Sequence, residues 1–256
     1  MNCRCRPGTF EDMSAEAVRP DVPGIEHEHP DVTGGWLRPA VFGAMDGLVS
    51  NVALIAGMAG GTRHLGDSSA VVLAGIAGLV GGAFSMATGE YVSVASQSEA
   101  AQREIAKERV EILRNPAGET AELAEMYVAK GLDARLAGEV ARQIHADVEN
   151  AVSVHAREEL GVDPHDLASP KLAAASSFAA FAVGASVPLL PYLLGATVLL
   201  PAVLLTVLAL FVCGAVVARV TIRPWWYGGA RQVLMGVGSA AVTYAIGALI
   251  GTSVTG

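Results

Sequence analysis

Five stretches of the chain are apolar over a length that can cross a bilayer. A membrane-spanning helix needs about 20 predominantly apolar residues. The stretches are Pro39 to Gly61, Ser68 to Val94, Leu172 to Leu194, Thr197 to Ala218 and Gln232 to Ile250. They are rich in Gly, Ala and Ser, which let helix backbones approach closely in lipid. The pattern predicts an all-α membrane protein with five transmembrane helices in a compact bundle.

Between the second and third spans, the pattern changes to that of soluble helices. Three helices are expected there, the first being a continuation of the second span. Asn, Asp and Ser caps, proline at a first helical position and terminal glycines mark the boundaries. The expected limits are Arg114 for the first helix, Asn115-Pro116 to Gly131 for the second, Asp133 to Gly161 for the third, and Ser169-Pro170 for the start of the third span.

The chain therefore divides into four parts. We expect a flexible cytoplasmic tail (1–36), spans one and two (37–96), a cytoplasmic carboxylate-rich helical metal-binding domain (97–169) and spans three to five (170–256). Arg219, Arg223 and Arg231 follow the fourth span, and short loops rich in Arg or Lys face the cytoplasm. Threading the spans from this loop places the N-terminus and the insert in the cytoplasm and the C-terminus outside.

Composition agrees with a membrane protein and adds a charge asymmetry. Hydrophobic residues make up 52% of the chain and charged ones only 16%, with a mean hydropathy of +0.44, which is unusual for a large soluble enzyme. Of the 25 acidic residues, 15 lie in 97–170, and the formal net charge is −8. With a pI of about 5.2 and no basic face, the chain is not expected to bind nucleic acid.

Two acidic residues lie inside apolar spans, Asp46 in the first and Glu90 in the second. A carboxylate at membrane depth costs at least about 2.5 kcal/mol on insertion scales, so such groups usually line a pathway or bind a cation. Met86 lies one helical turn before Glu90 and shares its face, which pairs a soft thioether with a hard carboxylate. These residues predict a cation pathway.

The insert carries glutamates at helical spacing. Glu104, Glu108 and Glu111 share one face of the first helix, and Glu119, Glu122 and Glu125 follow at spacings of three. Like charges at these spacings repel, and a polyvalent cation reverses the sign of that interaction. His155 and Glu159 lie one turn apart on the last helix and can complete such a site. The alternative is that these are solvated charges paired with nearby basic residues at little energetic consequence.

Two pairs of candidate metal ligands lie in the tail, Cys3 with Cys5 and His27 with His29. Two ligands make half a site, and short terminal tracts often accumulate such residues. The remaining cysteine, Cys213, lies in a span and is expected to pack. Three cysteines make no disulfide framework.

Four blocks of sequence together resemble the vacuolar iron transporter family, which includes yeast and plant vacuolar members, nodulin-like proteins and bacterial homologues. They are FGAMDGLVSNVALIAGMAGG in the first span, GGAFSMATGEYVSVASQSEA in the second, HAREELGVD at the end of the insert and VPLLPYLLG in the third span. The resemblance covers about residues 37 to 252. It implies a five-span homodimer that exchanges cytosolic ferrous iron, and in some members manganese, for protons, without a prosthetic group.

The resemblance also implies roles for particular residues. Those matching the family's ion pathway are Asp46, Met86 and Glu90, and those matching its cytoplasmic metal-binding glutamates are Glu108, Glu111, Glu119, Glu122 and Glu159, with Glu104 a weaker candidate. The chain departs from the family at His155 and Ala156, where members often have two methionines. Imidazole still suits iron and manganese, so His155 stays a candidate ligand.

The most favoured function is a proton-coupled exporter of ferrous iron, and not an enzyme, in the lipid of a bacterial plasma membrane. Two alternatives stay open. One is a manganese-selective exporter, and the other is a membrane-anchored ferroxidase or metal sensor. Transport is favoured because an enzyme or sensor has no need for acids within two separate spans. No GxxxxGK[ST] phosphate loop occurs in the chain, so the proton gradient is the expected source of energy.

Overall fold

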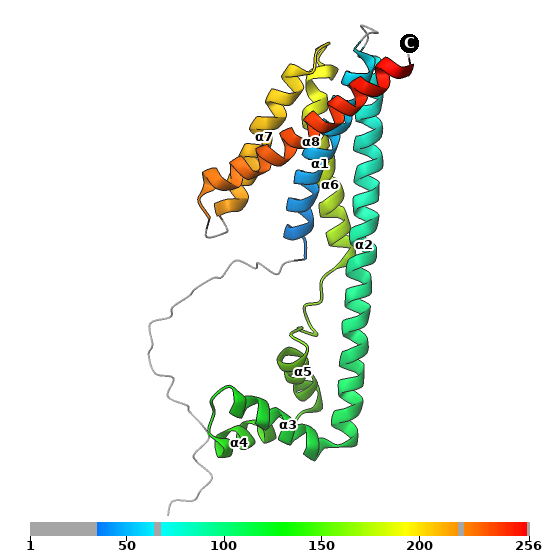
Figure 1. The fold of residues 1–256 in the computed structure, drawn as a ribbon. Coiled ribbons are helices and arrows are strands. Elements are labelled where there is room, and N and C mark those ends of the chain that lie inside the picture. The colour runs from blue at the N-terminus through cyan, green and yellow to red at the C-terminus, as the bar shows by residue number, and fades with distance from the viewer. Residues whose placement is uncertain (1–34, 64–67, 220–222, 255–256) are drawn as a thin grey trace, which may run out of the picture. The chain divides into compact units, whose positions relative to one another are not determined.

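Five helices of the protein are long and apolar enough to cross a membrane, as predicted (Figure 1). They are α1 (Leu37–Thr62), α2 (Ser69–Arg114), α6 (Pro170–Leu193), α7 (Leu200–Arg219) and α8 (Trp225–Val254). The computed structural model describes residues 35–63, 68–219 and 223–254, and every regular element in these ranges is an α-helix. The prediction of an all-α protein with five membrane helices is confirmed. Cys3, Cys5, His27 and His29 lie outside the described residues.

Helix α1 lies at the centre of the membrane helices. It packs against α6 and α8 most extensively, and also against α2 and α7. Glycines allow these contacts: a Cβ added at Gly43 would lie 2.7 Å from the carbonyl oxygen of Ser177 in α6, and one at Gly60 would lie 2.5 Å from that of Tyr244 in α8. Close packing of backbones replaces the hydrophobic driving force that lipid cannot provide.

The insert contains three short helices besides the extension of α2: α3 (Pro116–Ala129), α4 (Ala134–Ile144) and α5 (Val148–Glu159). The expected caps are present. Asn115 accepts a hydrogen bond from the amide of Gly118, and Asp133 accepts from those of Arg135 and Leu136. Gly131 and Gly161 follow α3 and α5 with φ of +100° and +67°, a backbone conformation that glycine adopts without strain.

The single helix predicted from Asp133 to Leu160 is wrong, because the chain breaks between Ile144 and Val148. Asp147 adopts an extended conformation, and its carboxylate accepts hydrogen bonds from the amides of Glu149 and Asn150, at 2.8 and 3.4 Å. This is an N-cap, which starts a new helix. Asp147 is therefore the sequence signal for the break, and the expected single helix overlooks it as a cap.

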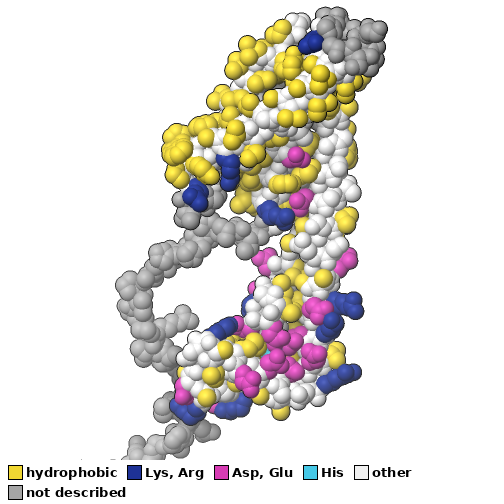
Figure 2. Space-filling model, viewed as in Figure 1, with side chains coloured by type: hydrophobic (Ala, Val, Ile, Leu, Met, Phe, Trp, Pro, Cys, Tyr) yellow, Lys and Arg dark blue, Asp and Glu magenta, His cyan; other side chains and the backbone are white. Residues whose placement is uncertain are grey.

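Helix α2 joins the membrane helices to the insert without interruption. Its 46 residues span about 69 Å at 1.5 Å per residue, more than twice the roughly 30 Å of a hydrocarbon core. On the face shown in Figure 2, hydrophobic side chains cover the membrane helices, and acidic side chains gather over the insert. The hydroxyl of Ser98 donates to the carbonyl oxygen of Ala168 at 2.9 Å, which ties the segment before α6 back to α2.

We expect Gly43→Ala to destabilise the protein, because the new methyl group meets the backbone of α6, which cannot move aside as a side chain would. Overpacking of this kind costs about 1–3 kcal/mol. The midpoint of thermal unfolding in detergent measures the effect. Gly238→Ala in α8 is the control, since a Cβ there meets no atom within 4 Å. Equal midpoints for the two variants would refute the close contact of α1 with α6.

Candidate metal centre and membrane pocket

The packing of α2 against α5 turns one glutamate of α2 towards a histidine of α5. Ile112 packs with Ala151 and Val152 in a buried cluster, and the partly buried Ile105 lies against it. Glu108 lies between Ile105 and Ile112 on the same face of α2, three and four residues from each. It therefore faces α5, where His155 lies one turn beyond Val152. Both polar side chains are buried, with exposed fractions of 7% for Glu108 and 0% for His155.

Three side chains meet at this point. Nδ1 of His155 lies 2.6 Å from Oε1 of Glu159 and 3.0 Å from Oε1 of Glu108. One potential ligand atom from each residue lies within 4.8 Å of the others. Oε1 of Glu108 is buried, and apart from this approach to His155 it has no hydrogen-bond partner among the described residues. A nitrogen and two carboxylate oxygens so arranged suit iron or manganese.

A second histidine, His145, sets the proton positions when both rings are neutral. Its Nδ1 lies 2.9 Å from the carbonyl oxygen of Ala141, and because a carbonyl only accepts, this nitrogen carries the proton. Nε2 of His145 is then an acceptor for Nε2 of His155, 3.3 Å away. Nδ1 of His155 is left with a lone pair facing two carboxylates, where a proton or a metal ion can satisfy all three groups. Sequence reasoning missed His145 because it assigned one continuous helix there.

Electrostatics favours a proton on the cluster near neutral pH. Burial, followed by the negative charge of Glu159, raises the pKa of Glu108 to about 7, and His155 opposes this shift. Burial and the negative charge of Glu122 raise the pKa of Glu119. The charges of Glu111 and Glu159 raise it further. The charges of these glutamates are therefore coupled. Glu104 takes no part, because it pairs with Lys107 at 2.6 Å on the exposed side of α2.

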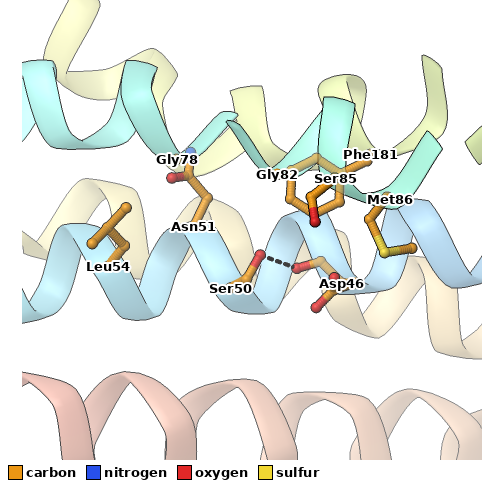
Figure 3. A pocket seen from close by; sticks show the side chains of 9 residues that line it. All are labelled: Asp46, Ser50, Asn51, Leu54, Gly78, Gly82, Ser85, Met86 and Phe181. Carbon is orange, nitrogen blue, oxygen red and sulfur yellow. Dashed lines mark hydrogen bonds between the residues drawn. The ribbon is translucent and has the colours of Figure 1, made fainter. Parts of the chain in front are cut away.

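A separate pocket of about 230 Å³ lies among the membrane helices (Figure 3). The residues that line it are Asp46, Ser50, Asn51, Leu54, Gly78, Gly82, Ser85, Met86 and Phe181. Asp46 is half-buried, and neither it nor Glu90 pairs with a basic side chain among the described residues. Met86 contributes to the lining and also packs beside the apolar cluster of Ala83, Phe181 and Ala185. Met86 therefore both lines the pocket and packs against the apolar cluster.

The pocket brings together two of the three predicted pathway residues. Asp46 from α1 and Met86 from α2 line it, whereas Glu90 does not and lies one turn further along α2 towards the insert. Sequence reasoning missed Ser50, Ser85 and Asn51, which add polar groups to the wall. Their sequence signal was weak, because hydroxyl and amide side chains are common where helices pack in membranes.

The chain is similar in sequence to a family of known proteins. Residues 37–248 match the model of the VIT family, a range that contains both the pocket and the insert. The chain belongs to the VIT family. VIT family members are transporters and not enzymes, so the predicted family and the predicted non-enzymatic role are confirmed.

Individual VIT relatives match over most of their length. A vacuolar iron transporter of Acanthamoeba castellanii is 39% identical over 88% of this chain and 78% of its own. Vacuolar iron transporter 1 of Oryza sativa subsp. japonica is 30% identical over 88% of this chain and 91% of its own. Vacuolar iron transporter 1 of Arabidopsis thaliana is 31% identical over 77% and 80%.

The raised pKa of Glu108 predicts a pH-dependent stability. A carboxyl whose pKa rises from 4.5 to about 7 on folding favours the folded protein fully below pH 4.5, and this contribution is lost as the pH rises through 7. Glu108→Gln, which stays neutral, should therefore raise the thermal midpoint of the metal-free protein more at pH 8 than at pH 5. Glu125→Gln, an exposed acid of α3, is the control. A pH-independent difference would refute the shift.

Proposed function

We propose that this chain is a proton-coupled transporter that moves ferrous iron, with manganous ion as a second substrate, out of the cytosol. The relatives named above are iron transporters by name. Metal transport as such follows from membership of the VIT family, whereas proton coupling, the choice of ion and the direction are our proposals. The proposal includes a homodimer, as the family resemblance implies.

One observation carries the proposal: a single continuous helix connects two carboxylate sites. Helix α2 carries Met86 and Glu90 in its apolar part and Glu108 in the insert. Eighteen residues separate Glu90 from Glu108, about 27 Å at 1.5 Å per residue. A rigid helix can thus hold a capture site in water at a constant distance from acids in the membrane. A metal sensor needs the first site but not the second.

The proposed cycle begins at the insert. A divalent ion binds Glu108, Glu159 and His155 and displaces the proton that the raised pKa of Glu108 retains near pH 7. Glu111, Glu119 and Glu122 add negative charge around the site and increase the local concentration of cations. In the membrane, Glu90 and Asp46 exchange a proton for the ion. The proton gradient then drives release on the far side.

The arrangement of the helices supports the proposed orientation. The last turn of α7, which ends at Arg219, and the first turn of α8 lie on the same side of the membrane helices as the start of α1 and the insert (Figure 1). The positive-inside rule makes this side cytoplasmic. The type of membrane is less supported: the relatives described above come from an amoeba and plants and are named vacuolar, so they lend no support to a bacterial plasma membrane.

A manganese-selective exporter is the second candidate function, and the ligand set of the insert favours it. The three groups that meet there are an imidazole and two carboxylates, and none is a thioether. Nitrogen and oxygen ligands without sulfur suit manganese at least as well as iron. Competition between ferrous and manganous ions for uptake into proteoliposomes distinguishes the two candidates.

Asp46→Asn and Glu90→Gln should each reduce metal uptake into proteoliposomes at least tenfold, because an amide cannot exchange a proton for an ion. Uptake of ferrous and manganous ions is measured with and without an imposed pH gradient. Glu125→Gln, in the insert but outside the cluster, should retain uptake. Uptake by the wild type that ignores the pH gradient would refute proton coupling, and normal uptake by either membrane variant would refute its role.

Replacing Glu108, Glu111, Glu119 and Glu122 together by Gln should weaken Mn(II) binding to the full-length protein at least tenfold, because the charge that attracts the ion is removed while side-chain volume is kept. Uptake at saturating metal should fall less. Calorimetry measures the binding. The matched control replaces Glu99, Glu104, Glu125 and Glu149 by Gln. It changes the net charge by the same amount, but at positions outside the cluster. Equal loss in the two proteins would show a general effect of charge.

A further inference from the structure

Asn51 carries a buried oxygen for which the fold provides no partner. The side chain lies in α1 among the membrane helices and is 1% exposed. Its Nδ2 donates to the carbonyl oxygen of Ala185 in α6 at 2.6 Å. Because a carbonyl only accepts, this hydrogen bond decides which end of the amide faces α6 and turns Oδ1 the other way. Among the described residues, Oδ1 has no hydrogen-bond partner.

The unpartnered oxygen lies against Gly78 of α2, a residue that lines the membrane pocket. A Cβ added at Gly78 of α2 would lie 2.7 Å from Oδ1, so the oxygen occupies the space that this glycine leaves open. Asn51 and Gly78 line the same pocket as Asp46 and Met86, and the amide of Asn51 lies beside Gly78 in Figure 3. A buried carbonyl without a partner is costly in apolar surroundings and calls for a functional explanation.

We propose that Oδ1 of Asn51 is a ligand for the transported divalent cation, about 7.5 Å along α1 from Asp46. This inference rests on the proposed function and adds a residue to its pathway. An amide oxygen suits ions such as manganous and ferrous ion. It carries no charge, so it holds the ion weakly enough for release. It also binds no proton near neutral pH. The amide oxygen therefore keeps contact with the ion while Asp46 exchanges a proton for it.

A purely structural role explains only half of the geometry. A hydrogen bond that joins α1 to α6 requires Nδ2 alone, and it leaves Oδ1 buried at a cost. Leu has the same branching and the same number of side-chain heavy atoms as Asn, and it removes this oxygen. If Asn51 serves structure alone, Asn51→Leu loses the bond to Ala185 and lowers the thermal midpoint. If Oδ1 is a ligand, the same variant loses that bond and metal binding as well.

The test measures Mn(II) binding to the full-length protein by electron paramagnetic resonance. The background carries Glu108→Gln and Glu159→Gln, so that the insert does not dominate the signal. Asn51→Leu should weaken binding at least tenfold. Gly78→Ala places a methyl group in front of Oδ1 and should weaken it similarly. Gly81→Ala, in the same helix, meets no atom within 4 Å and should bind as the background does. Asn51→Asp, which keeps an oxygen and adds charge, should bind at least as tightly.

The outcomes separate this inference from the proposed function. Unchanged Mn(II) affinity in Asn51→Leu and Gly78→Ala, or no bound Mn(II) in the background protein, would overturn the inference. If Asn51→Leu does not fold, the comparison of Gly78→Ala with Gly81→Ala decides. Binding that depends on Asn51 in a protein that transports neither ion would refute the proposed function and keep the ligand. Normal uptake by Asn51→Leu would refute the role of Asn51 as a ligand and leave the proposed function standing.

Discussion

The backbone of α1 approaches that of α6 so closely that a Cβ at Gly43 would lie 2.7 Å from the carbonyl oxygen of Ser177. Lipid supplies no hydrophobic force between helices, so contacts of this kind hold the membrane helices together. They also bring Asn51 within hydrogen-bond distance of Ala185 and bury it. The pocket beside Asp46 depends on the same glycines, because bulkier residues would separate the helices that form its walls.

In the insert, apolar packing has an equivalent effect on charge. Ile112 and Val152 hold α2 against α5, and this contact buries Glu108 beside His155. Burial disfavours the ionised carboxylate, and neighbouring glutamates add to the cost. A divalent cation removes both penalties at once, as a proton removes part of them. In the proposed cycle, competition between the metal ion and the proton therefore follows from the packing of α2 against α5.

Helix α2 contributes residues to both sites, and in the proposed cycle it links capture of the ion to its passage. The helix continues from the apolar helices into the insert without a break, so Glu90 and Glu108 keep their separation along its axis. The sites differ in ligands. The insert offers imidazole and carboxylates, while the pocket offers a carboxylate, hydroxyls, an amide and a thioether. A site that captures an ion can bind it firmly, whereas a pathway needs ligands that also release it.

The sequence alone determined the five membrane helices, the caps at Asn115 and Asp133, and the helical spacing of the glutamates in the insert. These features depend on local hydropathy, on hydrogen bonds within a few residues and on helical periodicity, all of which can be read along one chain. The break before Asp147 also depends on local sequence. It was missed because the capping aspartate is one of many acidic residues in the insert. Tertiary structure alone decided that Glu104 lies outside the cluster, that His145 touches His155, and that Oδ1 of Asn51 lies against Gly78 while Nδ2 binds α6. Each of these depends on which helix packs against which face, and residues far apart in the chain decide that.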